Sequence, residues 1–160
     1  MPRTGGGAKR RQKKRSASLL RAVVDTNIFV SGIINPAGPP GQIIKALRNS
    51  AFTLVSSSDI NEEILEVLSR PRLQKYHLQD ALFDIGVILY TQAELTRAKT
   101  KVKASPDPDD DKFLTAAIGG KAQYVVTGDK TGLLQLEEYQ GVRIITAKTF
   151  LRVLQGAPLE

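Results

Sequence analysis

Two apolar runs in this chain are each followed by an aspartate. Asp25 comes directly after residues 21–24, and Asp129 comes shortly after residues 124–127. If both runs are strands of one parallel sheet, their carboxyl ends meet at the same edge, where open α/β sheets bind ligands. Aspartate is common in turns, so either residue alone is a weak signal. Together they predict a pair of carboxylates at one edge of a sheet.

A predicted helix at about residues 60–68 contributes a third acidic side chain. On a helical wheel, Glu63 lies at the border of the apolar face, whereas Glu62 and Glu66 lie on the solvent side. Glu63 is therefore the acid that can turn inward toward the sheet. Glu66 is the alternative, although it lies further from the apolar face, and a border glutamate can also extend into water.

A run of four aspartates within residues 107–111 precedes another predicted helix. Capping and the helix dipole, worth about 0.3–1 kcal/mol per group, explain one or two of these aspartates but not four. We expect Asp110 to cap the helix and Asp109 to lie in the solvated approach. Asp111 falls in the first turn beside the apolar face, so it is the candidate for the site. Asp110 is the alternative, because helix starts are uncertain by a residue or two.

Clustered carboxylates raise one another's pKa and destabilise a protein that lacks a compensating cation. The chain has no cysteine and one histidine, and hard carboxylate oxygens without such ligands suit Mg²⁺ or Mn²⁺. Such an ion can lower the pKa of a bound water, and a second ion about 4 Å away can stabilise a leaving oxygen. The acids therefore predict metal-dependent hydrolysis of a phosphodiester bond.

Composition excludes several other classes of protein. Without cysteine there are no structural disulfides, thiolate zinc sites, iron–sulfur clusters or cysteine nucleophiles. No apolar run approaches the roughly 20 residues that span a bilayer, and no apolar segment follows the basic N-terminus as in a secretory signal. The glycine–lysine pattern of a phosphate-binding loop is absent. We expect a soluble, cytoplasmic protein with no membrane partner.

The net charge of +7 is concentrated at the N-terminus. Residues 1–20 hold seven basic residues and no acid, and removing those seven from the 23 Lys and Arg leaves 16, equal to the 16 Asp and Glu. We expect residues 1–20 to form a disordered basic tail, either a solubilising leader or an arm that binds phosphates. The candidate phosphate-binding residues are Lys9, Arg10, Arg11, Lys13, Lys14 and Arg15, with Lys130 beside Asp129 as either a phosphate contact or a plain turn lysine.

Short apolar strands alternate with helices over residues 21–156. The predicted strands are 21–24, 52–55, 124–127 and 142–145, and the predicted helices are 42–49, 60–68, 78–90, 111–118 and 148–154. Ser31 and Gly32 are assigned to a loop after the first strand, residues 36–41 to a second loop, and Asp59 to a capping box with Glu62. This order favours one α/β domain with three layers, in which helices flank a central, mainly parallel sheet.

The chain resembles the PIN-domain nucleases, in particular their bacterial and archaeal toxin-like group. The resemblance covers about residues 21–154 and rests on four motifs: residues 24–27 with Phe29, Ser31 and Gly32, residues 63–73, residues 107–114 and residues 126–130. It implies a PIN-like parallel sheet and metal-dependent cleavage of single-stranded RNA. It also implies four catalytic, metal-binding acids, which fall on Asp25, Glu63, Asp111 and Asp129, with Asn27 and Thr127 in support. A small antitoxin partner and a homodimer are further implications.

Two other functions compete with this prediction. The first is a PIN module that binds RNA or a protein partner without cutting. The second is a receiver-like domain that accepts a phosphoryl group, because such α/β domains also gather aspartates at strand ends. The paired aspartates here precede a helix, and Glu63 would have no role in a receiver, so the nuclease is favoured.

Overall fold

The computed structural model describes residues 19–76, 79–97 and 101–156. The predicted tail lies almost wholly outside these residues, and so do its six candidate RNA-binding side chains between residues 9 and 15.

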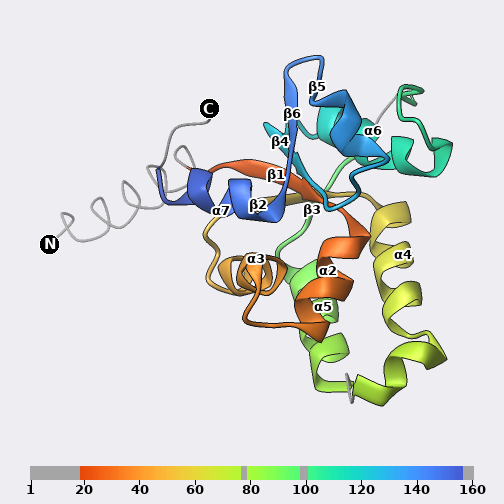
Figure 1. Cartoon of the computed structure of the whole chain (residues 1–160), viewed down its shortest axis with the longest axis vertical. Coiled ribbons are helices and arrows are strands. Elements are labelled where there is room, and N and C mark those ends of the chain that lie inside the picture. Colours follow the sequence, from red (N-terminus) through yellow and green to blue (C-terminus); the bar gives the residue numbers. More distant parts are fainter. Residues whose placement is uncertain (1–18, 77–78, 98–100, 157–160) are drawn as a thin grey trace, which may run out of the picture.

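A six-stranded sheet forms the centre of the fold (Figure 1). Its strand order is β3-β2-β1-β4-β6-β5, and every neighbouring pair is parallel except β5 and β6. The strands are β1 (Arg21–Val24), β2 (Thr53–Ser56), β3 (Glu94–Leu95), β4 (Tyr124–Val126), β5 (Glu138–Tyr139) and β6 (Val142–Ile145). Because β1 lies between β2 and β4, its apolar residues are buried on both faces, as expected for a parallel sheet.

Helices cover the sheet, which confirms the predicted α/β architecture with a mainly parallel centre. In Figure 1, α6 lies above the strands, and α2, α3 and α5 lie below them. The α-helices are α2 (Thr26–Ile34), α3 (Pro39–Arg48), α4 (Ser58–Leu68), α5 (Gln79–Thr91), α6 (Asp111–Gly119) and α7 (Ala147–Leu154). Three short 3₁₀ helices join them: η1 (Pro71–Tyr76), η2 (Pro108–Asp110) and η3 (Leu133–Leu136). None of the helices in the described residues is long and apolar enough to cross a membrane.

The segment after β1 is a helix, and the predicted loop there is wrong. Asp25 caps α2, and its Oδ1 accepts a hydrogen bond from the backbone N–H of Asn27 at 3.3 Å. Gly32 lets α2 approach α3 closely, because a Cβ atom on it would lie 2.6 Å from Ile44 Cδ1 and 2.9 Å from the carbonyl carbon of Pro40. The same α3 begins at Pro39, inside the other predicted loop, since proline is accepted in the first turn of a helix.

The N-terminus of α4 also differs from the prediction. Ser57, and not Asp59, caps this helix, and its hydroxyl accepts a hydrogen bond from the backbone N–H of Ile60 at 3.2 Å. Ser57 directly follows β2, so the chain enters the helix without a connecting turn. Asp59 is exposed in the first turn, where its charge complements the helix dipole.

Candidate active site

Asp25 lies at the carboxyl end of β1 and is buried, with 4% of its surface exposed. Its backbone N–H donates to the carbonyl of Val126 on β4 at 2.9 Å, and its Oδ2 accepts a hydrogen bond from Thr127 Oγ1 at 2.7 Å. Burial is the main cause that raises the pKa of Asp25 above its ordinary value, and the bonds from Thr127 and Asn27 oppose it. The negative charges of Glu63 and Asp129 raise this pKa further, so both lie within electrostatic reach.

Asp129 lies beyond the end of β4 and is tied to Asp25 through Thr127. The hydroxyl of Thr127, which is fully buried, donates to Asp25 and accepts the backbone N–H of Asp129 at 3.2 Å. The Oδ1 atom of Asp129 accepts from the backbone N–H of Thr131 at 3.1 Å and from its hydroxyl at 3.0 Å. These bonds fix the side-chain orientation of Asp129 beside Asp25.

Glu63 is the half-buried acid of α4, whereas Glu62 and Glu66 are exposed, as the helical wheel predicts. Its carboxylate accepts hydrogen bonds from Thr26 Oγ1 and from the Lys112 ammonium, with which it forms an ion pair. Glu66 instead pairs with Arg70, one turn along the chain. Glu63 is therefore the acid of α4 that contacts α2 and α6.

Asp110 belongs to the same group of acids. Burial and the negative charges of Asp25, Asp107 and Asp129 raise its pKa to about 6, and the Lys112 ammonium opposes this shift. A Cβ atom on Gly132 would lie 2.2 Å from Asp129 Oδ2 and 3.2 Å from Asp110 Oδ2. The carboxylates of Asp110 and Asp129 thus lie against the same glycine, where a larger residue would displace them.

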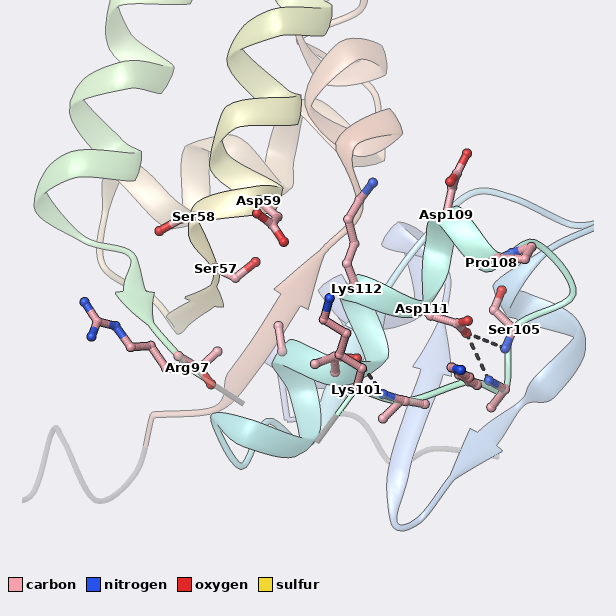
Figure 2. Close-up of a pocket in the computed structure, with 16 residues that line it drawn as sticks. Ser57, Ser58, Asp59, Arg97, Lys101, Ser105, Pro108, Asp109, Asp111 and Lys112 are labelled. Carbon is pink, nitrogen blue, oxygen red and sulfur yellow. Dashed lines mark hydrogen bonds between the residues drawn. The ribbon is translucent and has the colours of Figure 1, made fainter. Parts of the chain in front are cut away.

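Asp111 is turned away from this group toward a neighbouring loop. Its Oδ1 accepts hydrogen bonds from the backbone N–H groups of Ala104 at 3.0 Å and Ser105 at 2.7 Å (Figure 2). The physical reason is η2, which places Asp110 in a helical conformation before α6 begins. The first turn therefore directs Asp110, and not Asp111, toward the ends of β1 and β4, which favours the alternative left open by the sequence.

The remaining aspartates of the acidic run have separate surroundings. Asp107 caps η2 by accepting the backbone N–H of Asp109 at 3.0 Å, and Asp109 itself is exposed. Asp110 occupies the cap position of α6, as predicted, but its side chain makes no capping hydrogen bond. Its carboxylate is therefore available to the site.

We call Asp25, Glu63, Asp110 and Asp129 the acidic group. Its residues come from the end of β1, from α4, from η2 and from the end of β4. Within residues 19–76, 79–97 and 101–156, no three acidic or histidine side chains form a ready-made metal cage. An open arrangement of hard oxygen donors nevertheless fits Mg²⁺, which keeps several waters and commonly uses one or two carboxylates. Burial, followed by the negative charges of neighbouring acids, raises the pKa values of Asp25 and Asp110.

Sequence reasoning missed two partners of the acidic group, Thr26 and Lys112. Both bond Glu63, which lies 37 and 49 residues away from them along the chain. The sequence could have indicated them only by position, because each lies within two residues of a predicted acid. Of the other predicted residues, Asn27 is exposed, and Asn27, Thr127 and Lys130 line a cavity of about 660 Å³ that also includes Asp129.

Comparison with known proteins identifies the family to which this chain belongs. The chain belongs to the PIN domain family, whose model matches residues 21–131. This match confirms, at the level of the family, the resemblance inferred from the four motifs. PIN domains are generally nucleases.

Two particular proteins are similar to the chain. An uncharacterized protein of Methanocaldococcus jannaschii is 29% identical over 126 residues, which cover 78% of this chain and 81% of the relative. The second is a chain in the crystal structure of VapBC2 from Rickettsia felis bound to a DNA fragment from their promoter. It aligns with a TM-score of 0.52 and 14% identity over 79% of this chain and 98% of its own, a likeness that shows the fold alone.

Proposed function

We propose that this protein is an endoribonuclease that hydrolyses single-stranded RNA with the help of Mg²⁺ or Mn²⁺. The single observation that carries the proposal is the acidic group, in which four carboxylates from distant parts of the chain interact electrostatically. Repulsion among like charges is costly, and a divalent cation removes that cost. Membership of the PIN domain family supports nuclease chemistry at this place.

The proposed metal ligands are Asp25, Glu63, Asp110 and Asp129, with Asp110 replacing the Asp111 of the sequence-based prediction. Asp111 is less suitable because its Oδ1 already accepts two backbone N–H groups. When bound, a divalent ion supplies positive charge that polarises the phosphate and lowers the pKa of water.

The protein's own residues hold these carboxylates in position. Thr127 donates to the Asp25 carboxylate and accepts the backbone N–H of Asp129, and Thr131 donates to the Asp129 carboxylate. Thr26 bonds the Glu63 carboxylate, and the Lys112 ammonium pairs with Glu63 and offsets the negative charge around Asp110 while no metal is bound. Preorganised ligands of this kind spare the site from reorganising when substrate arrives.

The test is cleavage of a short single-stranded RNA by the purified full-length protein. We expect cleavage in Mg²⁺ or Mn²⁺ and none in excess EDTA. Glu63→Gln should abolish it, whereas Glu62→Gln is the matched control, because Glu62 is the exposed neighbour on the same helix. Cleavage that continues unchanged in excess chelator, or that survives Glu63→Gln, contradicts the metal mechanism. Binding without cleavage by the metal-loaded protein would favour the non-cleaving PIN module.

We further propose that the nuclease is the toxin of a toxin–antitoxin pair that acts in the cytoplasm. This part of the proposal rests on the motif resemblance and on the shared fold with a chain of the VapBC2 structure. A small protein encoded beside this gene should copurify with it and inhibit RNA cleavage, and light scattering should report a homodimer. A neighbouring protein that neither binds nor inhibits would argue against the toxin assignment.

We also propose, from their charge alone, that the N-terminal basic residues bind RNA phosphates. Replacing the basic residues at 9–15 by glutamine should lower RNA affinity most strongly at low salt, since contacts with phosphates release counterions. An unchanged dependence of affinity on salt would identify the tail as a passive leader.

A further inference from the structure

A cavity of about 850 Å³ lies at the N-terminal ends of α4 and α6 (Figure 2). It lies between the N-terminus of α4, the residues that follow β3, the segment 101–105 and the first turn of α6. Four basic side chains line it: Arg97, Lys101, Lys103 and Lys112. We call it the basic cavity.

Most basic side chains of the basic cavity form no ion pair within the described residues. Arg97, Lys101 and Lys103 are exposed, and none of them pairs with a carboxylate in the part of the chain that the structure describes. Three acids also line the cavity, but Asp111 is engaged by two backbone N–H groups. The other two are Asp59 and Asp109, so the lining holds four basic side chains and three carboxylates, a formal excess of one positive charge.

The segment 101–105, which carries Lys101 and Lys103, is hydrogen-bonded to α6. The backbone N–H of Val102 donates to Thr115 Oγ1 at 2.9 Å, and Asp111 holds the N–H groups of Ala104 and Ser105. Lys101 and Lys103 lie on either side of Val102, so their backbone positions are fixed relative to the helix. A charged ligand is bound with less loss of entropy when its partners are already ordered.

Lys112 connects the basic cavity with the acidic group. Its side chain lines the cavity, and its ammonium bonds Glu63. A polyanion bound in the cavity would therefore lie near the Glu63 carboxylate. Since residues 21–160 are formally neutral, a local concentration of lysines is needed to offset the repulsion between four carboxylates and a nucleic-acid backbone.

We propose that the basic cavity binds backbone phosphates of single-stranded RNA on one side of the cut bond. The inference rests on the proposed nuclease function and assigns Lys101 and Lys103 as phosphate contacts. An acidic protein segment is the competing occupant. RNA is favoured because Lys112 lines the cavity and bonds Glu63, so a strand held there would lie near one of the four carboxylates.

The experiment measures binding of a fluorescein-labelled 12-nucleotide RNA to the full-length protein in EDTA, across a series of salt concentrations. The test variant is Lys101→Gln with Lys103→Gln. The control is Lys45→Gln with Lys121→Gln, which removes two exposed lysines from outside the cavity. Each single-strand phosphate contact contributes about −0.7 to the slope of log affinity against log salt, so the test variant should lose about 1.4. Extrapolated from 1 M salt, this weakens binding roughly 25-fold near 0.1 M.

Four results decide whether Lys101 and Lys103 bind RNA phosphates. A smaller slope in the test variant alone, restored by Lys101→Arg with Lys103→Arg, supports the inference. Equal slopes for the test and control variants overturn it, and so does an absence of RNA binding by the wild type. A 12-residue polyglutamate that binds as tightly, with the same dependence on Lys101 and Lys103, overturns the choice of RNA. Wild-type cleavage in Mn²⁺ is measured in parallel, and its failure alone would reject the nuclease function while leaving the phosphate contacts supported.

Discussion

Replacing Asp110 or Asp111 by asparagine should change the free energy of unfolding in opposite directions when metal is absent. Asp110 is a repelled carboxylate, whose pKa is raised by burial and by neighbouring negative charges. Asp111 is a stabilising carboxylate, whose Oδ1 accepts two backbone N–H groups. The two residues are adjacent in the sequence, so each serves as the control for the other.

The magnitude for Asp110 follows from its pKa, which rises from 3.8 to about 6. A shift of about 2 units corresponds to at most about 3 kcal/mol of unfavourable free energy in the folded state. Solvent screening of a partly exposed group reduces this to about 1 kcal/mol. Asp110→Asn should therefore raise the free energy of unfolding by about 1 kcal/mol near neutral pH.

The pH dependence fixes the sign of this effect. The folded protein holds the Asp110 proton more tightly than the unfolded chain does, because the folded pKa is the higher one. Stability therefore falls as the pH rises from about 4 to about 6, and the penalty is complete above that window. The gain from Asp110→Asn should be largest above about pH 7 and should vanish below about pH 4.

Asp111→Asn should lower the free energy of unfolding by about 1–2 kcal/mol, because a neutral amide oxygen accepts the two N–H groups more weakly than a carboxylate. Urea unfolding in EDTA, followed by circular dichroism, measures both variants. RNA cleavage in Mn²⁺ should be abolished by Asp110→Asn and largely retained by Asp111→Asn. If Asp111→Asn stabilises the protein and abolishes cleavage while Asp110→Asn does neither, the assignment of the ligand is refuted.

Three further predictions concern the rest of the site. Asp25→Asn and Asp129→Asn should each reduce RNA cleavage by roughly 100-fold or more and abolish the rise in melting temperature on addition of Mn²⁺. A variant that still cleaves RNA and is still stabilised by Mn²⁺ would show that the replaced aspartate is not a metal ligand. Lys112→Gln should tighten Mn²⁺ binding measured by calorimetry, because the ammonium no longer competes for the carboxylate of Glu63, and unchanged affinity would rule out that competition. Thr127→Val should lower the free energy of unfolding by about 1–2 kcal/mol and slow cleavage, and Thr127→Ser should restore both. A Thr127→Val protein with unchanged stability and cleavage would show that the hydroxyl is dispensable.

The longer strands of the sheet were predictable. The ends of β1 and β6 coincide with the predicted apolar runs, and β2 and β4 differ from them by one residue, because a largely buried strand appears in the sequence as a mainly hydrophobic run. The two-residue strands β3 and β5 have no period to detect and exist only through pairing with β2 and β6. Helix α2 was missed for a different reason. Asp25 and the polar residues after it have the composition of a turn, and only the cap geometry reveals a helix.

Within the site, the positions that depend on a regular element were predictable. The helical wheel selects Glu63 over Glu66 because α4 keeps one period throughout its length. The choice between Asp110 and Asp111 depends on η2, whose tighter 3₁₀ turn changes the direction of each side chain from that expected for an α-helix. The bonds from Thr26 and Lys112 to Glu63 join distant residues, and no local pattern contains them.

The acidic run shows how four similar residues come to have different roles. The sequence argument that capping explains only one or two aspartates holds, because Asp107 alone accepts a capping hydrogen bond and Asp109 is exposed. Asp110 and Asp111 then leave one turn in different directions, the first toward the acidic group and the second toward the segment that carries Lys101 and Lys103. The same turn therefore fixes the relative positions of the carboxylates and of the lysines proposed to hold RNA. A change in the helical geometry of η2 would displace both together.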